Sequence, residues 1–220
     1  LRFGLPTGLN WFLEFGAFVL FINVVVAELG TTALAAFNIV MQINSISFMP
    51  AFGIGSAGAI LVGEAIGRRA LDRVWPIVRL TLATACTWMA SAGALYFLAP
   101  ATLMAVFQPE GVTSTTLVSV GASMLMLSAL WQVFDAANMT FSEALRAAGD
   151  TTWPMLARIV TAWFVFTPLA WAAVLVFDGG VTAVMVSVIV YIALLAVVLA
   201  LRFASGRWRQ IDLVGEPELI

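Results

Sequence analysis

Residues 181–201 read VTAVMVSVIVYIALLAVVLAL, a run of 21 residues without a charged side chain. An α-helix rises about 1.5 Å per residue, so about 20 apolar residues are enough to cross the roughly 30 Å hydrocarbon core of a bilayer. Five other apolar runs are also long enough. The sequence therefore predicts six membrane-spanning helices, at residues 4–27, 33–63, 74–99, 115–145, 154–176 and 181–202.

The composition agrees with a membrane protein. Hydrophobic residues make up 62% of the 220, charged residues only 10%, and the mean hydropathy is +1.04; soluble domains carry about a quarter charged residues. We predict an all-α membrane protein, with a six-span lobe at residues 1–203 and a cytoplasmic tail at 204–220. With one cysteine and no histidine, the chain lacks the residues for a disulfide framework, histidine catalysis or a His-containing zinc site. We expect no cofactor and no nucleic-acid partner.

The arginines predict the topology, because short cytoplasmic loops of membrane proteins are rich in basic residues. On the six-span reading, all ten basic residues fall on one side, and the connections on the other side carry only the acids Glu28, Glu110 and Asp178. Both termini are therefore expected to be cytoplasmic. The ten are Arg2, Arg68, Arg69, Arg73, Arg79, Arg146, Arg158, Arg202, Arg207 and Arg209.

Two carboxylates lie inside predicted spans. Glu14 is 12 residues from Arg2, and Asp135 is 11 residues from Arg146, which places both roughly 17 Å from the arginine-rich face. A charge at that depth costs about 2.5–3.5 kcal/mol, so such residues are usually functional. No arginine is expected at the same depth. Glu14 and Asp135 should therefore be protonated, hold a metal cation such as Na⁺, or await a cationic substrate.

Other polar residues recur at helical spacing beside these acids and predict a common polar interior. The alternative is a hydrogen-bond network that only joins the helices. Trp131, one turn before Asp135, could flank a bound cation, or it could be an ordinary packed tryptophan. The candidate cavity residues are Asn10, Trp11, Asn38, Gln42, Ser45, Ser128, Trp131, Gln132 and Asn138.

Residues 53–58 read GIGSAG and match the dinucleotide-binding pattern G-x-G-x-x-G. That pattern needs a preceding strand, whereas this stretch lies inside a predicted span, so we interpret its glycines as helix-packing positions. Pro50 and Pro168 predict kinks within their spans. Glu64 with Arg68, and Glu143 with Arg146, are expected to form solvated pairs at helix ends, and Asp150 is expected to cap the next helix.

Several short motifs, taken in order, resemble the multidrug and toxic compound extrusion (MATE) family, in particular the carboxyl-terminal six-helix lobe of its NorM-type branch. They are Leu5-Pro6, Glu14, Leu29-Gly30-Thr31 with Ala35-Ala36, Val62-Gly63-Glu64-Ala65-Ile66-Gly67, and Ala144-Leu145-Arg146-Ala147-Ala148-Gly149-Asp150-Thr151. In the last motif, alanine stands at position 147, where the family pattern has glycine. The likeness covers nearly all 220 residues.

The resemblance implies a secondary antiporter of the bacterial inner membrane that expels organic cations and drugs in exchange for Na⁺ or H⁺. It implies that Glu14 and Asp135 form the coupling-ion site, with Trp131 where the family has tyrosine. It also implies an amino-terminal lobe as partner, and since the chain starts without methionine, we read it as a piece of a longer protein. The alternatives are a flippase for lipid-linked anionic substrates, an intramembrane enzyme using a Glu14–Asp135 dyad, and a non-transporting scaffold.

Overall fold

The computed structural model describes residues 4–107 and 115–211, without the side chains of residues 4–7, 9–11 and 14. Every regular element in these ranges is helical. The α-helices are α1 (Gly4–Leu20), α2 (Thr31–Gly67), α3 (Val74–Leu98), α4 (Pro100–Val106), α5 (Thr115–Ser128), α6 (Gln132–Ala147), α7 (Thr152–Val160), α8 (Thr167–Trp171) and α9 (Gly180–Ala204). Short 3₁₀ or π segments connect or extend them: η1 (Phe21–Val26), η2 (Ala27–Leu29), η3 (Leu71–Arg73), η4 (Thr161–Phe166), η5 (Ala172–Val176) and η6 (Arg207–Gln210).

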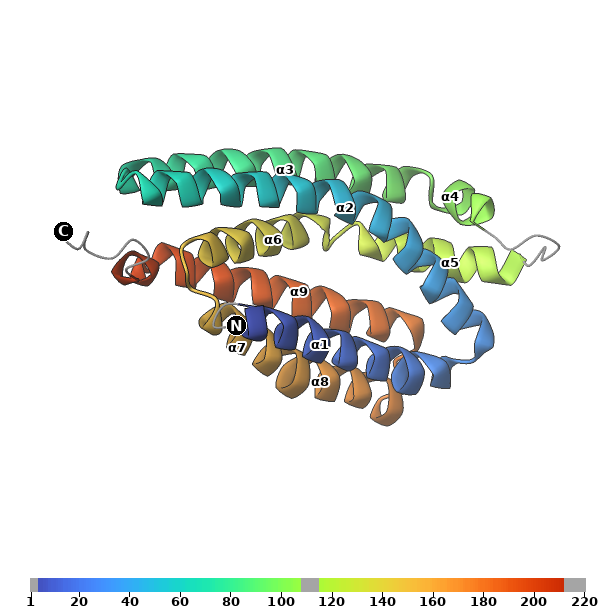
Figure 1. Ribbon diagram of the computed structural model, residues 1–220. Coiled ribbons are helices and arrows are strands. Elements are labelled where there is room, and N and C mark those ends of the chain that lie inside the picture. The colour runs from blue at the N-terminus through green and yellow to red at the C-terminus, as the bar shows by residue number, and fades with distance from the viewer. Residues whose placement is uncertain (1–3, 108–114, 212–220) are drawn as a thin grey trace, which may run out of the picture.

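The helices form an elongated bundle (Figure 1). The α2–α3 pair covers one side, α6 and α9 run through the middle, and α1, α7 and α8 cover the other side. Among the described residues, four helical runs are long and apolar enough to cross a membrane, at Thr31–Gly67, Leu71–Leu98, Thr152–Val176 and Gly180–Ala204, and α5 with α6 makes a fifth if counted as one bent span. The chain is thus an all-α membrane bundle.

The predicted span at residues 115–145 is broken. Helices α5 and α6 meet at an angle of 51°. Between them Ala129, Leu130 and Trp131 bond three residues back, to the carbonyl oxygens of residues 126–128, which is the tighter 3₁₀ pattern. Asp135 consequently lies in the first turn of a new helix, where the aligned backbone N–H groups stabilise a negative charge by about 0.3–1 kcal/mol.

Helix α2 continues through Pro50, and side chains from α3 bond to its backbone just before the proline. Trp88 Nε1 donates to the Ser47 carbonyl at 2.9 Å, and the Tyr96 hydroxyl donates to the Ile43 carbonyl at 3.0 Å. Pro168 stands at the start of the short helix α8, between the π segments η4 and η5. The second proline therefore coincides with irregular winding, because it cannot donate a backbone hydrogen bond.

The GIGSAG stretch lies in the interior of α2, and the packing interpretation is confirmed for Gly55 and Gly58 but not for Gly53, which is exposed and would have nothing within 4 Å of an added Cβ. A Cβ on Gly55 would meet Glu143 of α6 at 3.6 Å, and one on Gly58 would meet Thr81 of α3 at 2.4 Å. Small residues allow such close approach of helices in a membrane. A Cβ added at Gly63 or at Gly67, which are also on α2, would meet nothing within 4 Å.

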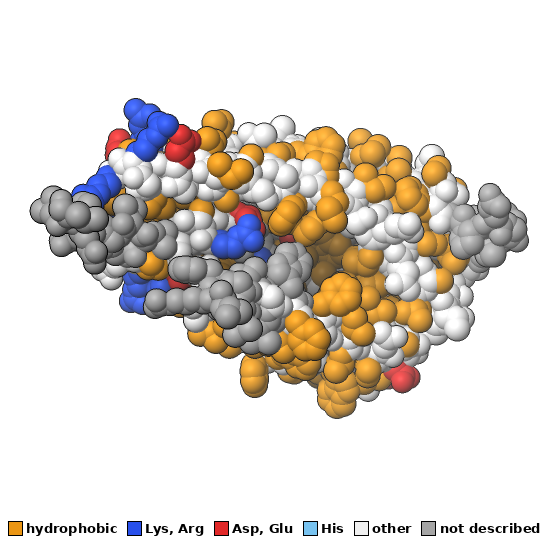
Figure 2. Space-filling model, in the orientation of Figure 1, with side chains coloured by type: hydrophobic (Ala, Val, Ile, Leu, Met, Phe, Trp, Pro, Cys, Tyr) orange, Lys and Arg blue, Asp and Glu red, His pale blue; other side chains and the backbone are white. Residues whose placement is uncertain are grey.

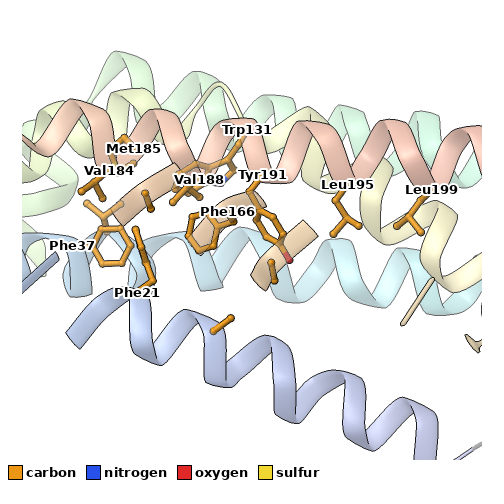
Figure 3. Packing of buried hydrophobic residues seen from close by; sticks show 14 of the residues in the cluster. Phe21, Phe37, Trp131, Phe166, Val184, Met185, Val188, Tyr191, Leu195 and Leu199 are labelled. Atoms are coloured by element: carbon orange, nitrogen blue, oxygen red, sulfur yellow. The ribbon is translucent and has the colours of Figure 1, made fainter. Parts of the chain in front are cut away.

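The central core is aromatic. The rings of Phe21 in η1 and Phe166 in η4 lie 4.7 Å apart, and Phe166 also contacts Tyr191 of α9 at 5.0 Å. These residues belong to the cluster in Figure 3. At the far end of α9, the first residues of the predicted cytoplasmic tail pack against the bundle, and residues 212–220 lie outside the described part of the chain. Trp208 is buried and donates to the Phe203 carbonyl at 3.0 Å, because a large indole ring is stabilised by packing.

Candidate ion and substrate cavity

A cavity of about 280 Å³ lies among α1, α2, α6, α7, η4 and α9. Aromatic rings form much of its apolar wall, and charged and polar side chains enter mainly from α6 and α7. Figure 2 shows a hollow on the viewed face, bordered by hydrophobic side chains with charged ones beside it. The lining residues are Phe15, Ala17, Phe18, Phe48, Phe52, Asp135, Asn138, Met139, Ser142, Glu143, Arg146, Asp150, Thr151, Pro154, Met155, Arg158, Phe166, Tyr191 and Ile192.

Asp135 and Asn138 were predicted to line a polar interior, and the structure places both on this cavity. They lie one turn apart on α6, and Ser142 follows on the same face. Asn10, Trp11 and Glu14 belong to α1, but their side chains lie outside the described part of the chain. Their neighbours Phe15 and Phe18 do line the cavity, so α1 forms one of its walls.

The position of the Arg158 side chain differs from the one expected. The residue count placed it at the membrane surface, and no arginine was expected near Asp135. In the structure Arg158 lines the same cavity, and its Nη2 donates to Ser142 Oγ at 3.1 Å and to Asn138 Oδ1 at 3.4 Å. The reason is the length of the side chain, which carries the guanidinium from α7 across to α6 while its methylene groups remain against apolar surface.

Two further acids of the cavity are paired with arginines. Glu143 pairs with Arg146 as expected, but its carboxylate is largely buried and is not at a solvated helix end. Asp150 does not cap α7. Instead its Oδ2 accepts from Arg202 Nε of α9 at 2.7 Å, and the Arg202 guanidinium lies 5.1 Å from the centre of the Trp153 ring. Buried carboxylates need such partners, because an unpaired charge in the interior is costly.

Ser128 and Gln132 were also expected to line the cavity, but they belong to a buried hydrogen-bond network between helices. Gln132 Nε2 donates to Asn44 Oδ1 at 2.6 Å, and Asn44 Nδ2 donates to Ser128 Oγ at 3.2 Å. Ser128 ends α5 and Gln132 begins α6, so Asn44 of α2 bridges the break in that span. This arrangement agrees with the alternative interpretation, a hydrogen-bond network that joins helices.

Sequence reasoning missed Asn44 and selected the neighbouring polar stripe of α2. Asn38, Gln42 and Ser45 are exposed and lie outside the cavity; Asn38 and Ser45 bond to backbone carbonyls of their own helix. Both stripes have helical spacing, since Asn44 and Ser47 repeat as regularly as Gln42 and Ser45. The spacing alone does not indicate which stripe faces the neighbouring helices.

Trp131 is buried in the hydrophobic core and does not line the cavity. Figure 3 shows it among the residues of the core cluster, which include Val188 and Tyr191 of α9. Its burial agrees with the interpretation as an ordinary packed tryptophan. The Trp131 carbonyl accepts the Asp135 backbone N–H at 2.8 Å, so Trp131 does lie one helical turn before Asp135, but its ring is buried in the core.

Comparison with known proteins identifies the family of this cavity-forming bundle. Residues 6–172 match the family model described as MatE. The chain belongs to the MatE family. It is 28% identical over 210 residues to a probable multidrug resistance protein NorM of Thermotoga maritima, covering 96% of this chain and 44% of that protein. It is 32% identical over 187 residues to the protein of the same description in Brucella suis, covering 83% and 38%.

Solved structures of the family have the same fold. An inward-facing multidrug resistance MATE family transporter superposes with a TM-score of 0.84 at 19% identity, covering 96% of this MatE chain and 48% of that one. The outward-facing conformation of such a transporter gives 0.84 at 18% identity, covering 94% and 46%. A transporter of the MOP superfamily from Pyrococcus furiosus, described as having reversed binding-pocket polarity, gives 0.85 at 17% identity, covering 94% and 46%. The chain spans less than half the length of these relatives, and it is a multi-pass membrane protein.

Proposed function

We propose that this MatE chain forms the carboxyl-terminal lobe of an exporter of organic cations, driven by entry of Na⁺ or H⁺ across a bacterial inner membrane. The observation that supports it most is Asp135, a carboxylate on a cavity of the helical bundle whose walls are rich in aromatic rings. A carboxylate recognises positive charge, and aromatic faces attract organic cations. The relatives' description as multidrug resistance proteins agrees with this chemistry.

In this mechanism Asp135 and Glu14 bind either the organic cation or the coupling ion. When Na⁺ or H⁺ enters from outside, it neutralises the carboxylates and removes their attraction for the organic cation, which then leaves. Coupling arises because the two ligands compete for the same negative charge. An amino-terminal lobe supplies the other half of the path. No covalent step is needed, so the chain acts as a transporter and not as an enzyme.

The test is transport in proteoliposomes that contain the native protein carrying this chain. Efflux of a fluorescent organic cation is measured under a Na⁺ gradient and, separately, under a pH gradient. Asp135→Asn and Glu14→Gln should each abolish gradient-driven efflux. Asp72→Asn removes an acid that is exposed and outside the cavity, and it should transport normally. Full efflux in both the Asp135→Asn and the Glu14→Gln protein would refute the carboxylate mechanism. A wild type that shows no efflux under either gradient would instead favour a non-transporting scaffold.

A second candidate function is supported by the arginines. A flippase for lipid-linked anionic substrates needs basic residues in its cavity, and Arg146 and Arg158 both line this one. Isosteric ions of opposite charge distinguish the two functions: an exporter of cations should bind tetraphenylphosphonium more tightly than tetraphenylborate, whereas a transporter of anions should show the reverse order.

A further inference from the structure

Both acidic and basic side chains line the cavity in the described part of the chain. Three carboxylates line it, on Asp135, Glu143 and Asp150, together with Arg146 and Arg158. Arg146 pairs with Glu143, and Asp150 pairs with Arg202 from α9. Arg158 donates to Asn138 and Ser142, which lie on the same α6 face as Asp135. The cavity therefore contains its own positive charge in the region where a transported cation would bind.

We propose that Arg158 is a specificity-determining residue that acts as an internal counter-cation, so that an organic cation must compete with its guanidinium for the carboxylate side of the cavity. This rests on the proposed function. The contacts of Arg158 place its positive charge within one to two helical turns of Asp135, because its acceptors are three and seven residues further along α6. At that separation a unit charge changes the affinity for a second cation by on the order of tenfold or more.

The position of Arg158 on α7 makes this competition dependent on conformation. The guanidinium connects α7 to α6 across the cavity, and α7 passes directly into the π-helical segment η4 at Thr161. Segments of π-helix often occur at functional sites. A small shift of α7 relative to α6 would withdraw the positive charge and raise cation affinity, whereas its return would expel the cation.

The experiment measures equilibrium binding of two isosteric probes, tetraphenylphosphonium and tetraphenylborate, to the purified native protein. Arg158→Gln removes the charge but keeps a hydrogen-bond donor for Asn138 and Ser142. It should bind the phosphonium about tenfold more tightly and the borate no better than wild type. Arg158→Lys keeps the charge and should bind the phosphonium with near wild-type affinity. Arg73→Gln, an identical change on an exposed arginine outside the cavity, should alter neither affinity.

Unchanged or weaker phosphonium binding by a folded Arg158→Gln protein would overturn the inference, and loss of borate binding without a phosphonium gain would assign Arg158 to an anion site instead. Folding is checked by gel filtration, and the Arg158→Lys protein provides the measurement if Arg158→Gln aggregates: a loss of phosphonium affinity there would also contradict the proposal. If the wild type binds no phosphonium but Arg158→Gln does, the proposed export function fails while the inference stands. If neither binds, both fail.

Discussion

The contact between α2 and α3 at Gly58 is close enough that one added methyl group should destabilise the bundle. An alanine Cβ at this position would lie 2.4 Å from Thr81 Oγ1, 2.6 Å from its Cγ2 and 3.0 Å from its Cβ. Thr81 cannot turn away, because it is branched at Cβ and its hydroxyl donates to the Ile77 carbonyl at 3.0 Å. In Gly58→Ala the two helices must therefore separate.

The expected magnitude follows from two opposing terms. Overpacking in a well-packed interior costs about 1–3 kcal/mol, and a 2.4 Å approach to a side chain that cannot turn away is expected in the upper half of that range, about 2–3 kcal/mol. Replacing glycine by alanine inside a helix gains about 0.8–1 kcal/mol. The net loss is about 1–2 kcal/mol. For a chain of this size, 1 kcal/mol corresponds to about 2–4 °C in Tm, so Gly58→Ala should melt about 2–8 °C below wild type.

The assay is thermal denaturation of the purified protein in detergent, followed by tryptophan fluorescence. Gly53→Ala is the matched control, since Gly53 is exposed on the same helix and a methyl group added there would meet nothing within 4 Å; its Tm should stay level or rise. Adding Thr81→Ala to Gly58→Ala removes Oγ1 and Cγ2 and should recover part of the loss. Equal Tm values for Gly58→Ala and Gly53→Ala would refute the reasoning.

Two further predictions concern buried polar groups. Asn44→Leu should cost about 1–3 kcal/mol, because it leaves the Gln132 amide without its 2.6 Å partner, and Asn44→Leu with Gln132→Leu should cost less than the sum of the single changes; additive losses in a denaturation cycle would contradict the network. Asp150→Asn should cost about 3 kcal/mol, since the largely buried Arg202 loses its charged partner. Glu64→Gln, which breaks an exposed pair with Arg68, should cost under about 1 kcal/mol. Similar melting temperatures for these two variants would count against the difference in burial.

The membrane fold could be predicted from the sequence because the bilayer places the same requirements on every segment that spans it. A span must be apolar and long, and its backbone must be satisfied internally, so runs such as residues 181–201 identify helices without knowledge of their neighbours. The same reasoning interpreted Gly55 and Gly58 correctly as packing positions, whereas Gly53 is exposed. It also selected Asp135, since a charge inside an apolar run stands out in the sequence.

The sequence did not determine which polar residues meet. Asn44 and Gln42 are two positions apart on α2, yet one bridges the break between α5 and α6 and the other is exposed. Helical spacing defines stripes, but the rotation of each helix in the bundle decides which stripe is buried. That rotation follows from packing against several neighbours at once, which no local pattern contains.

Composition and apolar periodicity therefore determined that this chain is a helical membrane protein with a carboxylate in its interior, because these properties depend on single segments and their solvent. Only the tertiary structure decided that the span holding Asp135 is broken, that Trp131 is core, and that Arg158 enters the cavity from α7. The physical reason is the length of the arginine side chain. It can cross from one helix to another, and the position of its guanidinium depends on the distance and orientation of the neighbouring helix.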